Sequence, residues 1–434
     1  MSHPRYENYK ASGIDWLDQI PHSWLMCKVK HISPFFTGWT PPTGRDDFYA
    51  GDNLWANISD LGPRTLFQTS KHISDSAIEA AQIQKTPKGS LLFSFKLSIG
   101  QVSFAGVDLY TNEAIASFTP NEKLDLGYAY YAYPIFLVKN ASTNIYGAKL
   151  LNQELIRSAD VALPSITEQK YIAEFLDYEI GNIDELIAQQ ERLIELLKEK
   201  RQASIAEAVT KGIASNVKLK NSGVEWLGLV PEHWQVLPLK RFFQLVVDQA
   251  PVDNDFELLS LYTDIGVKPR RELEARGNRA STTDGYFKVA KGDIVVNKLL
   301  AWMGALGVSE YDGVTSPAYD ILRAKCPLSS HYYDHLFRCG VLNTEFRKYS
   351  RGIMDMRLRL YFEEFGQFQM PFPPYEEQLE IVEKLKHTLE QFASLSNEAT
   401  KAIELLQERR SALITAVVTG QIDVRNSVHI TEAV

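Results

Sequence analysis

The chain has 434 residues, of which 45% are hydrophobic and 11% aromatic, a length and composition typical of two to four well-packed globular domains. The three scattered cysteines, Cys27, Cys326 and Cys339, argue against a disulfide framework and favour free thiols in a reducing cytoplasm. No stretch resembles a signal peptide, and the longest apolar run, 128–138, is too short to span a bilayer.

The net charge of −8 at first argues against a nucleic-acid partner. Residues 165–212 hold ten acidic and six basic residues, and residues 375–421 hold eight and five, so these two segments carry −7 of the −8. The rest of the chain is nearly neutral and can present local basic faces.

A motif near the N-terminus returns in the middle of the chain. The segment Lys10-Ala-Ser-Gly-Ile-Asp-Trp-Leu is followed by Pro21 and Trp24. Shifted by 210, residues 220–234 match residues 10–24 at seven of fifteen positions. Glycines and small residues between the motifs also match at a shift of 204, whereas most polar residues around them differ. We interpret this pattern as one fold, present twice, with two different surfaces.

Each copy predicts a mixed α+β domain. In the first copy we expect strands near 53–58, 91–95, 101–106 and 114–119, a helix near 126–138, a loop around 144–149 and a helix near 151–157. In the second copy we expect strands near 256–262, 293–298, 304–308 and 318–323, and helices near 330–338, 342–349 and 361–366.

A long helix is predicted over Ser165–Ile213. Apolar residues from Ile172 to Val209 recur at spacings of three and four, which gives one apolar stripe. A rod of about 65 Å with so narrow a stripe requires a partner helix. The segment Pro374–Ile422 repeats it: at a shift of 209, 11 of the 21 positions in 193–213 are identical.

These elements predict an α+β fold with two homologous globular domains, separated by two long antiparallel α-helices in a coiled coil and related by a pseudo-twofold axis. The predicted boundaries are 1–163 for the first domain, 164–215 for the first helix, 216–373 for the second domain, 374–422 for the second helix and 423–434 for a tail. Two related readers with a fixed separator are typical of proteins that recognise split DNA sites.

The ordered set of motifs resembles the specificity subunits of type I restriction–modification systems. The resemblance is carried by Ser12-Gly13, Trp16-Leu17, Pro21 and Trp24 with their copy at 222–234, by Gly38-Trp39-Thr40-Pro41 and Pro87-Lys88-Gly89, and by Leu163-Pro164 with Glu168-Gln169 opening the first long helix. It covers nearly the whole chain. Glu168-Gln169 returns as Glu377-Gln378, and we interpret Glu376-Glu377 as first-turn residues that favour the helix dipole.

The resemblance implies that each domain is a target-recognition domain for one half of a bipartite double-stranded DNA sequence. The helices set the spacing and dock two modification subunits, which use S-adenosylmethionine to methylate adenine N6. Restriction subunits, which use ATP and Mg²⁺, join to cleave. The resemblance implies that this chain binds none of these cofactors and does no chemistry itself.

The sequence shows no catalytic or metal motif that would contradict this expectation. Phe372-Pro-Pro-Tyr375 resembles the amine-holding motif of amino-methyltransferases, but phenylalanine cannot accept the amine hydrogen bond, so we interpret it as a turn. His331, His335 and Cys339 are four apart on a predicted helix, but together they span roughly 12 Å, too far for one ion. We therefore expect no metal site and interpret these residues as a packed helix face.

DNA contacts are expected from polar residues in loops and at strand ends, because Arg, Lys, Asn and Gln read bases and phosphates. The alternative for each is a solvated surface residue. Within the second domain, the basic run 348–359 is the strongest candidate. The predicted residues are Arg45, Lys71, Lys96, Gln101, Asn112, Asn144, Tyr146 and Lys149 in the first domain, and Arg270, Arg271, Lys298, Ser316, Tyr319, Arg351, Arg357 and Arg359 in the second.

The helices are expected to pair and also to dock partners. Leu196-Leu197 and Leu405-Leu406 give more apolar width than a two-stranded seam needs, so one leucine of each pair is free to pack on a partner. The predicted residues are Ile183, Ile187, Ile194, Leu196, Leu197, Leu389, Phe392, Ile403, Leu405 and Leu406.

A second hypothesis is a non-catalytic scaffold, in which two domains on a coiled-coil spacer bind protein or other ligands. It predicts polar surfaces shared between the copies and no salt-dependent affinity for DNA.

Overall fold

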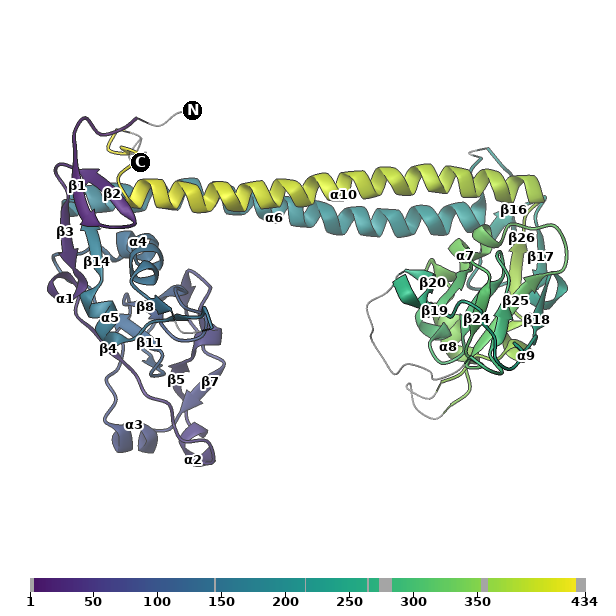
Figure 1. Cartoon of the computed structure of the whole chain (residues 1–434), viewed down its shortest axis with the longest axis horizontal. Coiled ribbons are helices and arrows are strands. Elements are labelled where there is room, and N and C mark those ends of the chain that lie inside the picture. The colour runs from purple at the N-terminus through teal and green to yellow at the C-terminus, as the bar shows by residue number, and fades with distance from the viewer. Residues whose placement is uncertain are drawn as a thin grey trace. The chain divides into compact units, whose positions relative to one another are not determined.

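The computed structural model describes residues 4–143, 146–214, 216–263, 265–272, 283–352 and 358–426. The chain divides into two compact units. Unit 1 comprises residues 1–190 and 402–434, and unit 2 comprises residues 191–401. Each unit therefore combines a mixed α+β domain with one part of each long helix (Figure 1).

Unit 1 is built around a five-stranded sheet of order β4-β11-β8-β9-β6. The sheet strands are β4 (Phe35–Thr37), β6 (Thr65–Leu66), β8 (Leu91–Ser94), β9 (Val102–Ala105) and β11 (Ile115–Phe118). The other strands are β1 (Tyr9–Ile14), β2 (Leu17–Pro21), β3 (Leu25–Lys28), β5 (Asn53–Ala56), β7 (Lys71–Ile73), β10 (Tyr110–Thr111), β12 (Ser142–Thr143), β13 (Lys149–Leu150) and β14 (Asp160–Leu163). The helices are α1 (Val29–Ile32), α2 (Asp46–Tyr49), η1 (Ile58–Asp60), α3 (Asp75–Ala81), α4 (Leu126–Lys139) and α5 (Gln153–Ser158).

The central strands of unit 1, β8 and β11, form from short apolar segments of the sequence. All four residues of β8 and all four of β11 are buried, as expected for strands covered on both faces. Helix α4 begins after Asp125, whose carboxylate accepts a hydrogen bond from the Tyr128 N–H at 2.9 Å. Its buried face joins these strands in one core with the long helices.

Unit 2 repeats this plan with a four-stranded sheet of order β18-β25-β22-β23. The sheet strands are β18 (Phe243–Val246), β22 (Ile294–Asn297), β23 (Leu306–Val308) and β25 (Tyr319–Ala324). The other strands are β15 (Leu219–Asn221), β16 (Leu229–Pro231), β17 (Gln235–Pro238), β19 (Leu259–Tyr262), β20 (Gly266–Pro269), β21 (Phe287–Val289), β24 (Gly313–Thr315) and β26 (Gln369–Phe372). The helices are η2 (Leu239–Arg241), η3 (Arg270–Glu272), η4 (Ala301–Met303), α7 (Ser330–Arg338), α8 (Asn343–Tyr349) and α9 (Phe362–Phe365).

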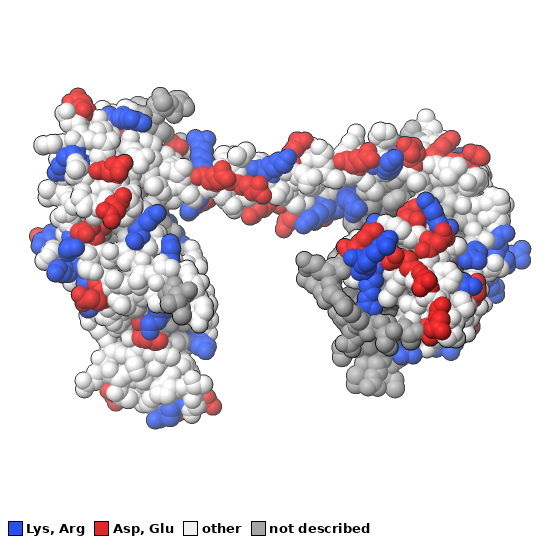
Figure 2. Space-filling model, in the orientation of Figure 1, with Lys and Arg blue, Asp and Glu red and all other residues white. Residues whose placement is uncertain are grey.

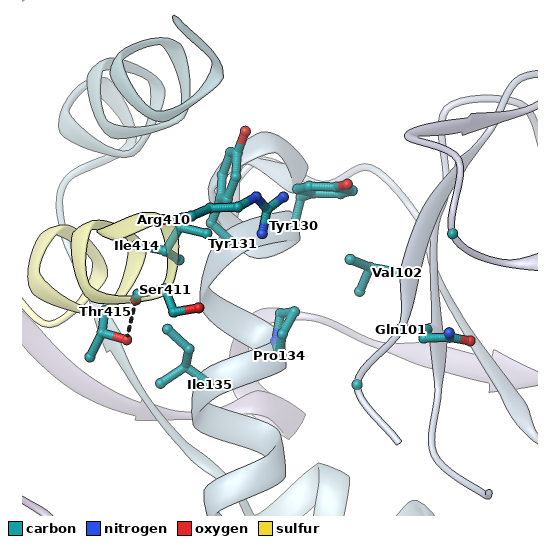
Figure 3. Close-up of a pocket in the computed structure, with 12 residues that line it drawn as sticks. Gln101, Val102, Tyr130, Tyr131, Pro134, Ile135, Arg410, Ser411, Ile414 and Thr415 are labelled. Atoms are coloured by element: carbon teal, nitrogen blue, oxygen red, sulfur yellow. Dashed lines mark hydrogen bonds between the residues drawn. The ribbon is translucent and has the colours of Figure 1, made fainter. Parts of the chain in front are cut away.

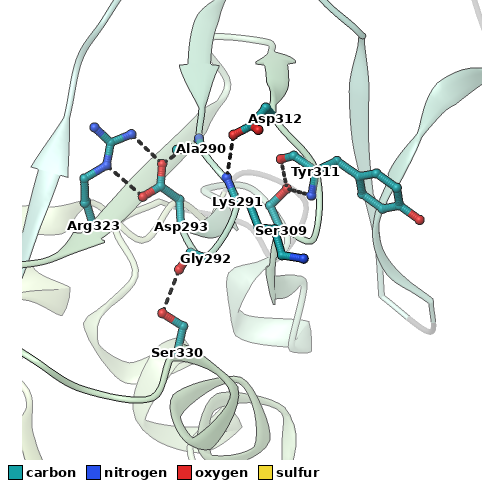
Figure 4. A network of polar contacts seen from close by, with 9 residues as sticks. All are labelled: Ala290, Lys291, Gly292, Asp293, Ser309, Tyr311, Asp312, Arg323 and Ser330. Atoms are coloured by element: carbon teal, nitrogen blue, oxygen red, sulfur yellow. Dashed lines mark hydrogen bonds and ion pairs between the residues drawn. The ribbon is translucent and has the colours of Figure 1, made fainter.

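A buried ion pair is particular to the core of unit 2 (Figure 4). Asp293, in the turn before β22, accepts two hydrogen bonds from the Arg323 guanidinium at 2.8 and 2.6 Å and one from the Ala290 N–H. The Asp293 side chain is 4% exposed. At the equivalent position of unit 1 the sequence has Ser90, so the two cores are closed by different chemistry.

The two long helices are α6 (Ile166–Lys211) and α10 (Tyr375–Val418). In unit 1, Ile172, Leu176 and Ile183 of α6 share a core with Leu413 and Val417 of α10. In unit 2, Ile205 and Val209 of α6 share a core with Ile381 and Leu385 of α10. The segments in each unit run antiparallel, side by side (Figure 1). The predicted α+β class and the two long helices are therefore confirmed.

Two local predictions were wrong. Helix α10 ends at Val418, four residues before the predicted Ile422, because Gly420 adopts a φ of 75° against the first domain. A Cβ atom on Gly420 would lie 2.3 Å from Cδ of Pro21, so only glycine fits. Lys149, predicted in a loop, lies in β13, which pairs antiparallel with β12. Asn144 and Arg357 lie outside the described residues.

None of the helices in the described ranges combines the length and the apolar character that a bilayer crossing requires.

Candidate nucleic-acid interface

The repeated Trp and Glu residues fasten each domain to its long helix. In unit 1, the Trp24 indole N–H and the Tyr6 hydroxyl both donate to Oε1 of Glu168, at 2.9 and 2.7 Å. In unit 2, the Trp234 indole N–H donates to Oε2 of Glu377 at 3.0 Å. Glu377 lies in the first turn of α10, as interpreted, and its carboxylate has a second role that the sequence did not reveal, because it also binds an indole that is buried in the domain.

The repeated glutamines have an equally defined role. Gln169 Oε1 accepts from the Asp125 N–H at 2.8 Å, and Gln378 Oε1 accepts from the Ser329 N–H at 2.8 Å. Each amide also donates to the carbonyl of a proline just before its helix, Pro164 or Pro373. Both side chains are buried, so each connects the start of a long helix to the start of a domain helix, α4 or α7.

Phe372-Pro-Pro-Tyr375 lies where β26 passes into α10, so its two prolines form the short connection between the strand and the helix. Within the described ranges, no group of three or more His, Cys, Asp or Glu residues is arranged to hold a metal ion. His331 is exposed and lies 3.1 Å from a Glu310 carboxylate oxygen, whereas Cys339 is buried and donates to the Leu336 carbonyl.

The predicted DNA-binding residues of unit 1 fall into separate groups. Lys96 and Asn112 come together where β8 ends and β11 begins, since Phe95 N–H donates to the Ala114 carbonyl. Asn112 Oδ1 accepts from the Ala114 N–H at 3.1 Å. Glu113, which sequence reasoning missed, lies between them: it forms an ion pair with Lys96 at 3.7 Å and accepts from the Thr40 hydroxyl.

The remaining candidates of unit 1 lie elsewhere on its surface. Arg45 pairs with Asp47 at 2.7 Å, and the Lys71 ammonium lies over the Tyr49 ring. Tyr146 is 87% exposed and Lys149 is exposed. Gln101 lines a cleft next to α4 (Figure 3). Exposed aromatic and cationic groups of this kind can bind bases and phosphates, but they do not form one site.

The candidates of unit 2 converge more closely. Lys298 pairs with Asp320 at 3.1 Å, and its backbone carbonyl accepts from the Leu360 N–H, next to Arg359. Arg359 and Arg351 exchange two backbone hydrogen bonds of 2.9 Å. Ser316 accepts from the Tyr319 N–H through its carbonyl and from the Ala318 N–H through its hydroxyl. Lys298, Ser316 and Tyr319 therefore lie at the end of β22 and the start of β25.

Charge and burial differ among these residues. Burial raises the pKa of Tyr319 above its ordinary value, and the nearby Arg270 charge opposes this shift only in part. Arg271 pairs with Glu257 at 3.2 Å, and Arg351 pairs with Glu364. Figure 2 shows lysine and arginine side chains interspersed with acidic ones in both units, with no single basic face in this view.

The end of β22 and the start of β25 in unit 2 are the equivalent of the end of β8 and the start of β11 in unit 1. Asn112 and Ser316 occupy matching turns at a shift of 204, and each caps the N–H two residues further on. A carboxylate holds the lysine in each place, Glu113 in unit 1 and Asp320 in unit 2. We call this place the strand-end surface of each unit.

The predicted docking residues divide by exposure. Leu196 and Leu405 are 44% and 65% exposed, whereas their neighbours Leu197 and Leu406 are half-buried. One leucine of each pair is therefore exposed and its neighbour is half-buried. Ile183 is buried, and the half-buried members are Ile187, Ile194, Leu389, Phe392 and Ile403.

Comparison with known proteins gives a consistent result. Residues 21–196 match the family model described as the type I restriction modification DNA specificity domain. The chain is 24% identical over 329 residues to the EcoBI type I restriction enzyme specificity subunit of Escherichia coli, covering 69% of this chain and 66% of the relative. It is 26% identical over 188 residues to the MjaIX specificity subunit of Methanocaldococcus jannaschii, covering 42% and 43%. The matches thus span less than two thirds of these relatives.

Two solved structures share the fold over most of the chain. One comes from work on complex assembly and conformational transition of the type I R-M system, with a TM-score of 0.67, 14% identity and coverage of 93% of this chain and 99% of the other. The other is the HsdS subunit from Thermoanaerobacter tengcongensis, with a TM-score of 0.56, 14% identity and coverage of 93% and 98%. The chain is therefore similar to type I restriction enzyme specificity subunits, and its residues 21–196 are similar to the type I restriction modification DNA specificity domain.

Proposed function

We propose that this chain is the DNA sequence-recognition subunit of a type I restriction–modification complex, in which each unit reads one half of a bipartite target. The observation that carries the proposal is the contrast between the repeated scaffold and the strand-end surfaces. Glu168 and Glu377 make the same contact to tryptophan. The polar residues at the two strand-end surfaces differ, as two readers of different half-sites require.

The long helices set the distance between the half-sites and dock two modification subunits, which transfer methyl groups from S-adenosylmethionine to adenine N6 in the cytoplasm. Restriction subunits that use ATP and Mg²⁺ join the same complex. Leu196 and Leu405 are suited to docking because they are exposed leucines on the long helices, and Leu193, one turn before Leu196, is exposed as well. The chain itself acts without catalysis.

Methylome sequencing of cells that carry this chain with its modification subunits tests the proposal. We expect adenine methylation confined to one bipartite motif with a fixed gap. Replacing residues 216–373 by the corresponding segment of a relative should change one half of the motif and leave the other. Methylation without a bipartite motif would refute the proposal.

A binding experiment separates this function from the scaffold hypothesis. With modification subunits present, the complex should bind duplex DNA with an affinity that falls steeply as salt rises. A scaffold for proteins or other ligands would show no such dependence.

A further inference from the structure

Two clefts occupy equivalent positions in the two units. Cleft 1, in unit 1, has a volume of about 340 Å³ and lies between α4, the Gly100 turn and α10 (Figure 3). Cleft 2, in unit 2, has a volume of about 440 Å³ and lies between α7, the Gly304 turn and α6. At a shift of 209, Arg201 and Ile205 of cleft 2 correspond to Arg410 and Ile414 of cleft 1.

The domain sides of the two clefts differ in chemistry. At a shift of 204, Tyr130, Tyr131 and Pro134 of cleft 1 become Asp334, His335 and Arg338 in cleft 2. Cleft 1 is therefore largely aromatic and apolar, whereas cleft 2 is lined by ionisable and polar groups. Both units therefore keep a cleft and one arginine from the long helix, but the domain side chains that face this arginine differ between the units.

The shared arginine is neutralised in only one unit. In cleft 1 the Arg410 Nε–H donates to Oδ1 of Asp184 at 2.8 Å. In unit 2, the position equivalent to Asp184 is Ala393. Arg201 is exposed and forms no ion pair with any residue that the structure describes. Its guanidinium therefore keeps five donors for a ligand.

The other groups of cleft 2 leave that charge uncompensated. Arg338 lies 3.8 Å from the Asp334 carboxylate and donates to the Thr263 carbonyl at 2.9 Å. Burial lowers the pKa of His335 to about 4, so the imidazole is neutral at pH 7. Because Asp334 offsets Arg338, the surplus positive charge of the cleft comes from Arg201.

Cleft 2 also offers neutral polar groups. Gln202, Thr263 and Asn343 line it, and their side-chain amide N–H and hydroxyl groups are hydrogen-bond donors. Gly304 contributes no side chain, which leaves space at the floor. Guanidinium, amide and hydroxyl donors around one hollow are the groups that proteins use to bind phosphate oxygens.

We propose that cleft 2 binds a phosphate group of the DNA backbone, with Arg201 as its charged contact. The inference rests on the proposed function and deepens it, since it gives unit 2 a backbone contact that unit 1 lacks. Cleft 1 cannot act in the same way, because Asp184 already occupies the Arg410 guanidinium and the facing side chains are tyrosines and proline.

The test measures the slope of log K against log salt for the complete complex, with its modification subunits, on duplex DNA. Each lost phosphate contact lowers the slope by about 0.9. We expect this change for Arg201→Ala. We expect it also for Ala393→Asp, which keeps the arginine but supplies the carboxylate that Asp184 supplies in unit 1. Arg410→Ala is the matched control and should leave the slope unchanged.

An unchanged slope for both Arg201→Ala and Ala393→Asp would overturn the inference. Loss of modification subunits from the Arg201→Ala complex in gel filtration would also overturn it, because the cleft would then bind a carboxylate of a protein partner. If the unsubstituted complex shows no salt-dependent DNA binding, the proposed function itself fails, which is a distinguishable result.

Discussion

The two units share the contacts that attach each domain to its long helix, and they differ in the side chains of one core turn and of the clefts beside the long helices. Glu168 and Glu377 bind equivalent tryptophans, and Gln169 and Gln378 accept from the backbone N–H at equivalent helix starts. The differences lie in the core turn before the central strand, where unit 2 has Asp293, and in the clefts beside the long helices. In a duplicated chain, the contacts that hold a domain to its helix are therefore kept, whereas surfaces and secondary polar contacts diverge.

We expect the largest loss of stability when the glutamate that binds the tryptophan is removed from either unit. Glu168→Ala leaves the Trp24 indole N–H and the Tyr6 hydroxyl buried without an acceptor, and we expect unfolding free energy to fall by about 3 kcal/mol. Glu377→Ala should cost about 2 kcal/mol, because its second partner, His233, is exposed. Urea unfolding of both variants measures this. Equal stability of the unsubstituted and Glu168→Ala chains would contradict the stabilising role of the hydrogen bond between the repeated glutamate and tryptophan.

The buried ion pair of unit 2 gives a second, unit-specific effect. Arg323→Ala leaves the Asp293 carboxylate buried without a countercharge and should destabilise the chain by about 2 kcal/mol, less than for a fully buried pair because Arg323 is 40% exposed. Unit 1 suggests the compensated control: Asp293→Ser with Arg323→Thr copies Ser90 and Thr119. This double variant should lose less stability than Arg323→Ala alone in the same denaturation experiment, and a larger loss would argue against the explanation.

Matched tyrosines sharpen the comparison at a smaller scale. The Tyr332 hydroxyl donates to the Val209 carbonyl of α6 at 2.6 Å. The Tyr128 hydroxyl donates to the Ala162 carbonyl at 2.6 Å and, at 3.4 Å, to the carbonyl of Val418, the equivalent of Val209. Tyr128→Phe and Tyr332→Phe should each cost about 1 kcal/mol, since each leaves a buried carbonyl with one partner fewer. Thermal unfolding of the two variants should give similar shifts. A large loss in only one unit would show that the attachments are not equivalent.

The smallest effect on stability is expected on the exposed face of the helices. Leu405→Lys should change unfolding free energy by less than about 0.5 kcal/mol, because the side chain is 65% exposed. Leu406→Lys, the half-buried neighbour, should cost more than about 1 kcal/mol. Under the proposed function, Leu405→Lys should still reduce co-purification of modification subunits. Undiminished co-purification with this folded variant would exclude Leu405 from docking.

The sequence alone determined the α+β class, the two long helices and eight of the strands, among them β8 and β11 of unit 1 and β22 and β25 of unit 2, because these features follow from local periodicity. The apolar run of β8 and the apolar residues of α6, which recur at spacings of three and four, can be recognised without any tertiary contact. The duplication was equally visible, because a repeat is a property of the sequence itself. The family resemblance, supported by the match over residues 21–196, followed from the same ordered motifs.

Only the tertiary structure decided what the motif residues contact. Glu377 lies in the first turn of a helix, where a helix-dipole role is a sufficient local explanation, and its partner Trp234 is 143 residues away in the sequence. Arg201 and Arg410 are identical in the repeat, yet one is paired and the other is not, because pairing depends on whether the neighbouring helix offers Asp184 or Ala393. Partners far apart in the chain are set by packing, and local patterns do not record them.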